Sequence, residues 1–595
     1  MINDMTIALA QMDVIPGQPR VNVDKMISMI QEAKQKNVDL ICFPEMCIGG
    51  YLLGDKFLED AYCEELMSYN SEILDASIDI AICYGNIYVD EKSDGYHPNK
   101  DGRSRKYNAV YVVQNGKYAK RSKENGILPF GVQPKTLLPN YRFFDDERYF
   151  FSLPDVATDF GKELKDLLSP FLISLGNTIV PVGVELCEDL WCRDYRALGE
   201  PINITNILIE AGAQKIINLS ASPWTFMKNN ARDRRVKFLK EQSKSFVKYY
   251  YVNCVGVQNN GKNIITFDGG STVYNENGDP CILSNKGWQE DLMIIDQKSS
   301  FESKMRKIGN TVQEKYKAIS NGLKKSSNIL GDNPNFVIGL SGGIDSSLVA
   351  TLLVLAFGKN NVVGVNMPSK YNSSKTKECA KTLANNLGIK YLIMPIEDMV
   401  KANSNTLESD GKVLSEFNLE NVQAKIRGTS IQSNLAAKYK AFFTNNGNKV
   451  EIALGYATLY GDWGGAISPI GDLTKTEVVE MCKYINKVVF GEDIIPNQLF
   501  PDSLWRFQED QIEPTAELKS NQVDPMKFGY HCKLLDELTN YQKKSIEDIM
   551  DWYLEGVLHE KLGINEQLML RWKIDNPKEF LRDLEWFYNT IQKNV

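Results

Sequence analysis

Residues 336–347 read Phe336-Val-Ile-Gly-Leu-Ser-Gly-Gly-Ile-Asp-Ser-Ser347, and this stretch decides the fold of the second half of the chain. A short apolar run enters a Ser-Gly-Gly turn, and a helical pattern from Leu348 to Phe357 leaves it. Glycine lets a backbone approach an anion closely, and the N–H groups and dipole of a helix start favour negative charge. The loop lacks the Lys-Ser/Thr pair of a Walker-type loop. The stretch therefore predicts a strand, a tight loop and a helix that together hold phosphate.

The loop resembles the pyrophosphate loop of the ATP-pyrophosphatase superfamily. Those enzymes cleave ATP between its α- and β-phosphates, adenylate a carbonyl oxygen and let a nitrogen or sulfur nucleophile displace AMP. Asp345 stands where a carboxylate can bind the Mg²⁺ that accompanies a triphosphate. The resemblance implies that ATP contacts Ser341, Gly342, Gly343, Asp345, Ser346 and Ser347.

Composition restricts the class of protein. A chain of 595 residues suggests about two to four domains. Its net charge of −8 gives no basic excess for a nucleic-acid partner. No apolar run reaches the roughly 18 residues of a membrane span, and the first ten residues lack the features of a signal peptide. The 11 cysteines are scattered without paired CxxC units, which favours reduced thiols in the cytoplasm over a zinc site.

Buried strands and helical stretches alternate along the first 290 residues, and a second α/β pattern begins near Asn335. We expect one layered α/β domain over residues 1–290, a linker and helix over 291–330, and a second α/β domain over 331–595. After about residue 500 the pattern becomes mainly helical. The strands expected in the front domain are Met5–Ala10, Val38–Phe43, Ile78–Tyr84, Asn108–Val113, Ile179–Val184, Lys215–Leu219 and Tyr249–Val252. Those expected behind residue 335 are Phe336–Leu340, Val362–Met367, Tyr391–Pro395 and Val450–Leu454.

Three segments in the front half carry candidate catalytic residues. Glu45 ends Asp-Leu-Ile-Cys-Phe-Pro-Glu, Lys135 opens Lys-Thr-Leu-Leu-Pro-Asn-Tyr, and Cys187 ends Val-Gly-Val-Glu-Leu-Cys before Glu-Asp-Leu-Trp. Loops at strand ends are where α/β sheets place their sites. None of the three histidines, His97, His531 and His559, lies in a recognisable catalytic setting. A nucleophile without histidine is therefore expected.

These segments resemble the nitrilase superfamily, and more closely the glutaminase domain of the glutamine-dependent NAD synthetases. The resemblance implies that Cys187 is the nucleophile, Glu45 the general base and Lys135 the cation that steadies the oxyanion. We also expect the ammonium to lower the pKa of the thiol. The family's Phe-Asp-Glu has Asp146 in place of Glu, so the carboxylate that supports Lys135 is either Asp146 or Glu147. Contacts to glutamine are implied for Tyr51, Tyr141, Glu188, Ser222 and Lys228.

Further segments of the back half resemble the NAD synthetases. They are residues 420–427, where Lys425 replaces an arginine of the family, and residues 448–462, 469–476 and 514–518. The resemblance implies further ATP contacts at Met367, Lys475 and Thr515 and Mg²⁺ ligands at Asp345 and Glu451. For deamido-NAD it implies Asn421, Arg427, Glu451 and Asp462.

Taken together, we expect an N-terminal four-layer α-β-β-α nitrilase-like sandwich and a C-terminal doubly wound, Rossmann-like ATP-pyrophosphatase domain. The first would release ammonia from glutamine. The second would adenylate deamido-NAD with ATP and Mg²⁺, and ammonia would displace AMP to give NAD. The resemblance implies a homo-oligomer, a dimer or larger. Two alternatives remain open: another ATP-pyrophosphatase that amidates a different acid or thiolates RNA, and a non-catalytic nucleotide sensor.

Overall fold

The computed structural model describes residues 5–90, 104–197, 200–259, 261, 263–306, 311–520, 522, 524–540 and 543–594. The chain divides into two compact units, residues 1–310 and 311–595. The segment expected to be a linker and a helix contributes to both. β17 (Asp291–Ile295) pairs with β1 (Ile7–Gln11) in the first unit, whereas α8 (Thr311–Lys325) packs on α10 (Ile344–Phe357) in the second.

Two sheets form the centre of the first unit. The first has the strand order β17-β1-β2-β3-β4-β5, with β6 paired to β4, and the second has the order β16-β15-β12-β11-β8-β7. The other strands of the first sheet are β2 (Leu40–Cys42), β3 (Ala81–Asp90), β4 (Arg105–Gln114), β5 (Lys117–Tyr118) and β6 (Val132–Pro134). Those of the second are β7 (Phe171–Leu175), β8 (Thr178–Leu186), β11 (Lys215–Ser220), β12 (Lys248–Asn253), β15 (Thr272–Tyr274) and β16 (Pro280–Leu283).

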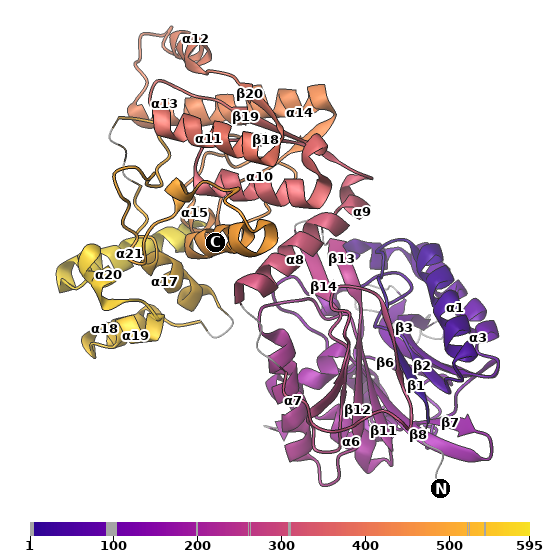
Figure 1. Ribbon diagram of the computed structural model, residues 1–595. Helices are drawn as coiled ribbons and strands as arrows, with labels where there is room; N and C mark the ends of the chain where they lie inside the picture. Colours follow the sequence, from indigo (N-terminus) through magenta and orange to yellow (C-terminus); the bar gives the residue numbers. More distant parts are fainter. Residues whose placement is uncertain are drawn as a thin grey trace. The chain divides into compact units, whose positions relative to one another are not determined.

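The two sheets pack face to face, with helices on their outer sides. Leu9 and Val112 of one sheet meet Val184, Leu219 and Val252 of the other in a single buried cluster. In Figure 1, α1 (Pro19–Gln35) and α3 (Asn70–Ala76) lie outside the first sheet, and α6 (Ile204–Glu210) and α7 (Lys228–Gln242) lie outside the second. This confirms the four-layer α-β-β-α sandwich.

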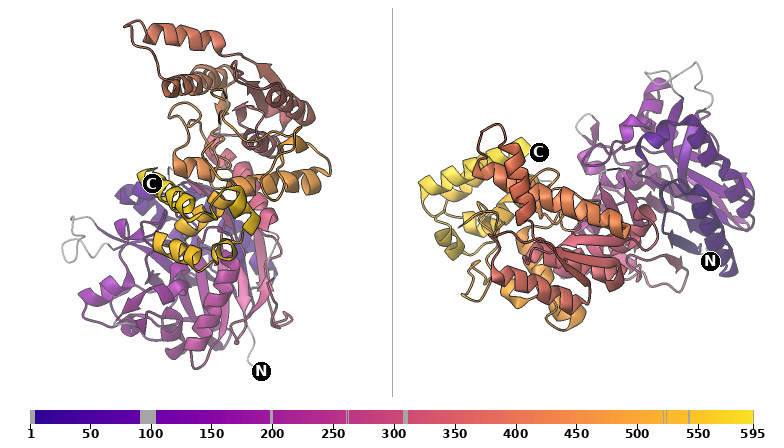
Figure 2. Two further views of the ribbon diagram at one scale, coloured as in Figure 1. Left: turned by 90° about the vertical axis from the view of Figure 1, so that its left-hand side faces the viewer. Right: turned by 90° about the horizontal axis from the view of Figure 1, so that it is seen from above.

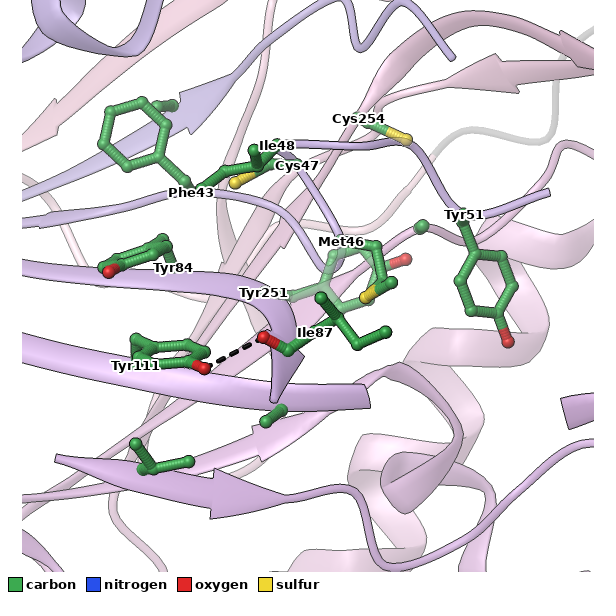
Figure 3. Close-up of a cluster of buried hydrophobic side chains, with 14 of the residues drawn as sticks. Phe43, Met46, Cys47, Ile48, Tyr51, Tyr84, Ile87, Tyr111, Tyr251 and Cys254 are labelled. Atoms are coloured by element: carbon green, nitrogen blue, oxygen red, sulfur yellow. Dashed lines mark hydrogen bonds between the residues drawn. The ribbon is translucent and has the colours of Figure 1, made fainter. Parts of the chain in front are cut away.

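A second apolar cluster fills the outer layers of this unit (Figure 3). The rings of Tyr84 and Tyr111 stack with centroids 5.3 Å apart, and the Tyr111 hydroxyl donates to the carbonyl of Ile87 at 2.9 Å. Phe43 and Cys47, which flank the Glu45 loop, are fully buried in the same cluster. The loop is therefore fixed on both sides by core packing.

A four-stranded parallel sheet, β20-β19-β18-β21, organises the second unit. Its strands are β18 (Asn335–Gly339), β19 (Val362–Asn366), β20 (Lys390–Ile393) and β21 (Ala441–Phe443). α10 and α11 (Ser374–Leu387) pack on the sheet together, and α14 (Ser433–Tyr439) packs on β18 and β21. Figure 2 shows helices on both faces. The doubly wound fold is confirmed, and the order reverses at β18, the strand that enters the 336–347 loop.

One expected strand is wrong. Residues 450–454 belong to a helix, α15 (Lys449–Leu454), because the Asn448 side chain accepts from the backbone N–H groups of Val450 and Glu451 and Glu451 closes a capping box. The remaining strand of the sheet is β21, which the sequence analysis did not identify. The helical C-terminal part is α17 (Tyr530–Thr539), α18 (Ile546–Leu554), α19 (Leu558–Leu562), α20 (Glu566–Arg571) and α21 (Pro577–Asn594). Among the described residues, no helix has the length and apolar character needed to cross a membrane.

Candidate active sites

Cys187 lies at the carboxyl end of β8, at the first residue of the 3-10 segment Cys187–Asp194. Its φ is +30°, which is rare for a residue with a side chain and costs conformational energy. Cys187 is 9% exposed. A sharp, strained turn thus places this one sulfur at the end of a strand, where the sequence predicted the nucleophile.

Glu45 and Lys135 form a buried ion pair on the first sheet. Lys135 Nζ donates to Glu45 Oε1 at 2.7 Å, and neither side chain is exposed. Asn108 Nδ2 donates to the same oxygen at 2.7 Å, while the backbone N–H of Ala221 donates to Glu45 Oε2 at 3.0 Å. Glu45 follows β2, Lys135 follows β6 and Asn108 belongs to β4, so three segments of one sheet converge on a single carboxylate.

Asp146, rather than Glu147, supports Lys135. Lys135 Nζ donates to Asp146 Oδ2 at 3.2 Å and to the Tyr51 hydroxyl at 3.3 Å, and Tyr51 donates to Asp146 Oδ1 at 2.8 Å. Glu147 is exposed. Burial raises the pKa of Asp146 to about 6, although Lys135 acts to lower it. All three N–H donors of Lys135 therefore have acceptors before any substrate is bound.

The electrostatics of Cys187 differ from the expectation. Burial and, to a smaller extent, the negative charge of Glu45 raise the pKa of the thiol to about 12, because the opposing effects of Lys135 and Lys228 do not compensate. Lys135 thus lowers the pKa of the thiol as expected, but burial outweighs this effect and the net shift is upward. Because the thiol is protonated at neutral pH, the chemistry needs a proton acceptor at the moment of attack, which fits a carboxylate beside the sulfur.

Four of the predicted glutamine contacts, Tyr51, Tyr141, Glu188 and Lys228, interact electrostatically with the Cys187 thiol. Glu188 is 5% exposed and accepts from the hydroxyls of Tyr141 at 3.0 Å and Tyr195 at 2.9 Å. Lys228, at the start of α7, donates to the carbonyl of Pro223 at 3.2 Å, and burial lowers its pKa although the charge of Cys187 opposes this. The backbone N–H of Ser222 donates to Asn253 Oδ1 at 2.8 Å. The surroundings of Cys187 thus contain a buried carboxylate, Glu188, and a half-buried ammonium, Lys228.

In the second unit, the 336–347 loop has the close-packed form that the sequence predicted. Gly342 has φ +88°, and a Cβ there would lie 1.9 Å from the carbonyl oxygen of Thr376, so only glycine fits. The backbone N–H of Gly343 donates to Ser341 Oγ at 3.1 Å, and Ser346 and Ser347 donate to the carbonyl of Gly343 at 3.1 and 2.8 Å. The loop leads directly into α10, whose first turn carries Asp345.

Asp345, Glu451 and Lys475 form a charge cluster beside this loop. Lys475 Nζ contacts Asp345 Oδ2 and donates to Glu451 Oε1 at 3.3 Å, and Asn448 Nδ2 donates to Asp345 Oδ1 at 3.2 Å. Burial raises the pKa of Glu451 to about 7 against the effect of Lys475. Burial acts to lower the pKa of Lys475, but the two carboxylates outweigh it and the net shift is upward.

A pocket of about 260 Å³ opens beside this cluster. Of the predicted residues, those that line it are Ser341, Asp345, Ser346, Met367, Arg427, Glu451 and Asp462. Gly342, Gly343 and Ser347 belong to the loop but do not line the pocket. Lys475 does not line it either, but it is paired with Asp345 and Glu451, which do. Arg427 is held by the carbonyl of Met367 at 3.1 Å.

Two predicted residues lie away from the lining. Thr515 lines a smaller cavity of about 140 Å³ among Trp505, Phe528 and Trp572. Asn421 accepts from the Thr458 hydroxyl at 2.9 Å, next to the segment that carries Asp462.

Comparison with known proteins assigns a family to each half of the chain. Residues 6–306 match the family model for carbon-nitrogen hydrolases and residues 313–561 the model for NAD synthases. The chain is 32% identical to a glutamine-dependent NAD(+) synthetase of Synechocystis over 87% of its own length and 85% of that protein's.

The chain belongs to the glutamine-dependent NAD(+) synthetase family.

Another family member, from Thermotoga maritima, is 30% identical over 90% of this chain and 88% of its own length. Among solved structures, the glutamine-dependent NAD+ synthetase of Acinetobacter baumannii in complex with ADP superposes with a TM-score of 0.68 at 26% identity. That superposition covers 97% of this chain and 94% of the other. The fusion of the two units is thus a family property.

Sequence reasoning missed several residues that hold these family sites. Asn108 carries no motif, since it is one polar residue at the start of an expected strand. Asp189 accepts from the backbone N–H groups of Leu137 at 2.8 Å and Leu186 at 3.1 Å, and so joins the Lys135 and Cys187 loops. Asn448 holds Asp345 and caps α15. Its spacing to Glu451 is the capping-box signal that was available in the sequence.

Proposed function

We propose that the chain converts deamido-NAD, ATP, glutamine and water into NAD, AMP, pyrophosphate and glutamate. Glutamine hydrolysis belongs to Cys187, Glu45 and Lys135, and NAD formation to the pocket beside the 336–347 loop. The observation that carries the proposal is the presence, in one chain of this family, of a thiol beside a buried Glu–Lys pair and of a phosphate-type loop beside two carboxylates.

In the front site, Cys187 Sγ attacks the side-chain amide carbon of glutamine as its proton passes to Glu45. The tetrahedral intermediate collapses when its C–N bond breaks, and the same proton passes from Glu45 to the leaving nitrogen, which departs as ammonia. Water then attacks the glutamyl thioester, gives a proton to Glu45, and the C–S bond breaks to yield glutamate and a thiol that regains the proton. Lys135 supports the oxyanion with its charge, and its longest bond, to Tyr51 at 3.3 Å, is the one most readily released.

The surroundings of Cys187 fit an amino acid. Glu188, buried beneath two tyrosine hydroxyls, supplies the negative charge that pairs with the α-ammonium group. Lys228, a half-buried cation that donates to the carbonyl of Pro223, supplies the positive charge for the α-carboxylate, and Ser222 immediately precedes Pro223 in the chain. Tyr51 and Tyr141 contribute hydroxyls on the side of Lys135 and Glu188.

In the back site, Ser341, Ser346 and the start of α10 hold the ATP phosphates, and Met367 lies on the adenosine side of the same pocket. Arg427 and Asp462 serve the deamido-NAD side, with Asn421 behind them. Lys475 adds a point charge near the reacting phosphate. Thr515 joins the site through the segment 514–518, whose Ala516 and Leu518 line the pocket.

The donor set fits Mg²⁺ bound jointly with the triphosphate. Mg²⁺ takes oxygen ligands and is commonly held by one or two carboxylates together with substrate phosphates. Asp345 and Glu451 offer such oxygens at the pocket wall, their side chains being 18% and 21% exposed. Among the described residues, no group of three or more His, Cys, Asp or Glu side chains could hold a metal by itself. The ion would neutralise phosphate charge while Lys475 shifts toward the nucleotide.

We further propose a cytoplasmic homo-oligomer, a dimer or larger. Large apolar side chains are exposed on the second unit at Ile393 (60%), Val413 (85%) and Phe417 (71%), which suits an interface with another copy.

Product analysis tests the function. The chain is incubated with deamido-NAD, ATP, Mg²⁺ and glutamine labelled with ¹⁵N in its side-chain amide. The expected result is ¹⁵N in NAD with AMP and pyrophosphate in equal amounts. Amidation of a different acid, or RNA thiolation, in place of NAD formation would replace this proposal with the alternative of another ATP-pyrophosphatase activity.

A further inference from the structure

The hydrogen bonds to Glu45 single out one of its lone pairs. A carboxylate offers about four lone-pair positions, two on each oxygen. On Oε1 both are occupied, by Lys135 Nζ and Asn108 Nδ2, each at 2.7 Å. On Oε2 one is occupied, by the backbone N–H of Ala221 at 3.0 Å. The free acceptor position of Glu45 is therefore on Oε2.

Asn108 has an unusual hydrogen-bond state. It is fully buried in β4, and its side-chain Oδ1 is enclosed without any hydrogen-bond partner. A buried acceptor without a partner costs stability. An amide group that could rotate would therefore be expected to find partners for both its oxygen and its nitrogen. The orientation is retained because Nδ2 bonds the carboxylate. The carbonyl of Asn108 also accepts from the backbone N–H of Lys135 at 2.8 Å, so one residue holds both members of the ion pair.

We propose that Asn108 is a positioning residue for glutamine hydrolysis: it closes Oε1 of Glu45 and thereby makes Oε2 the proton acceptor for Cys187. This inference rests on the glutaminase activity proposed above. Lys135 cannot fix the carboxylate alone, because it is also bonded to Asp146 and Tyr51 and can occupy only one position of Oε1. Without Asn108, Oε1 has a free lone pair of its own, and the carboxylate can turn to present either oxygen.

Other titratable groups face Glu45 and share its environment. Their charges interact with it from the Tyr51 loop, the Asp146 turn, the Cys187 turn and the end of β12. They are Lys135, Asp146, Tyr51, Cys187 and Cys254. Since none is altered by a change at Asn108, a difference between variants at this position reports on Glu45 and its loss of one donor.

The test substitutes Asn108 and a matched asparagine. Asn108→Leu keeps the approximate volume and removes the donor. Asn86 in β3 is the control, since it is also fully buried with an orphaned Oδ1, but its Nδ2 donates to Leu66 and Asn70, both at 2.9 Å. Gly85, the neighbour of Asn86, packs against Glu45. Because successive strand residues point to opposite faces, Asn86 faces away from Glu45. Asn86→Leu thus measures the structural cost alone.

Glutamate release is followed from pH 5.5 to 9 in the full chain, with ammonia-driven NAD formation as the check on folding. For Asn108→Leu we expect kcat to fall by about 10²-fold, part of what a general base contributes. The KM for glutamine stays within about threefold. The acid limb of the pH profile moves up by about one pH unit, because the ionised carboxylate loses a donor. Asn86→Leu keeps the wild-type kcat and acid limb.

Asn108→Asp, which keeps the shape of the side chain, serves where Asn108→Leu does not fold. It places a second carboxyl beside Glu45, so the acid limb moves further up than in Asn108→Leu. The inference is overturned if Asn108→Leu, or Asn108→Asp in its place, has the profile of Asn86→Leu, or if its loss lies wholly in KM. A wild-type chain that releases no glutamate would instead remove the proposed function itself.

Discussion

The two sites share one arrangement of charges in two different settings. In the front unit, Lys135 lies between Glu45 and Asp146, and in the back unit, Lys475 lies between Asp345 and Glu451. Both lysines are buried, at 0% and 3% exposure. The carboxylates differ: Glu45 and Asp146 are 0% and 7% exposed, whereas Asp345 and Glu451 are 18% and 21% exposed and border a pocket.

This difference separates two uses of the same cluster. An ion pair closed to solvent stays in place throughout a reaction and orients a base, because releasing either partner would leave a buried charge. We expect a cluster on a pocket wall to exchange its partners, because the phosphate and Mg²⁺ proposed for this site would replace the lysine contact from the open side. We therefore expect the front site to be preformed and the back site to be completed by its substrates.

Removing the proposed nucleophile, Cys187, should separate the two sites most sharply. In Cys187→Ala we expect glutamine-driven NAD formation to fall by at least about 10⁴-fold, because no thioester can form. Ammonia-driven formation stays near the wild-type rate, since the back site needs only the nitrogen nucleophile. NAD is assayed with each nitrogen source in turn. Equal losses with both sources would contradict the division of labour between the units.

Removing a carboxylate of the Asp345–Glu451–Lys475 cluster should have the opposite effect: NAD formation is lost and glutamine hydrolysis remains. In Asp345→Ala we expect NAD formation from either nitrogen source to fall by about 10³-fold, as when a metal and phosphate contact is lost. Glutamate release at Cys187 persists. The measurement is pyrophosphate release beside glutamate release in one reaction. Wild-type pyrophosphate release in this variant would show that Asp345 is not part of the triphosphate site.

The closed character of the front site can be tested by alkylation. Because burial raises the pKa of Cys187 to about 12, the substrate-free thiol is protonated at neutral pH. The thiolate fraction grows with pH below the pKa, so alkylation by iodoacetamide should accelerate about tenfold per pH unit from pH 7 to 10. Cys187→Ala supplies the background from the other buried thiols. A rate that levels off below pH 8 would reveal a thiolate already present.

The sequence was informative about which residues lie at strand ends or in family motifs. It was uninformative about properties that depend on how the layers pack. Glu45 and Cys187 each end an apolar run, so their places at strand ends were predictable. Lys135 was found only through the family motif that it opens. The upward pKa shift of Cys187 was not predictable, because burial follows from the assembled layers. The choice of Asp146 over its neighbour Glu147 depends on the short turn at residues 146–148, which turns one side chain inward and the other to solvent.

The error at residues 450–454 has a local cause. The run Val-Glu-Ile-Ala-Leu is short and mostly apolar, a pattern that strands and buried helices share. The deciding signal was Asn448 three residues before Glu451. These two capping residues also bond to Asp345 and Lys475, respectively. β21 was missed for the related reason that only three residues of it pair with β18.

The smallest predicted effect concerns two helix caps, one in each unit. Thr474 caps α16 (Lys475–Tyr484) and Ser152 caps α4 (Leu153–Asp159), each in a capping box with the residue three positions on. Replacing either by alanine should cost about 1 kcal/mol of stability, measured by denaturant unfolding. Only Thr474 precedes a site lysine, so only Thr474→Ala should also raise the KM for ATP, by about threefold, as Lys475 loses its fixed helix start. If Ser152→Ala changes the KM for ATP equally, the effect follows general stability, and the open cluster does not depend on its helix as proposed. If neither variant changes it, the substrates themselves order Lys475, which would strengthen the contrast with the preformed front site.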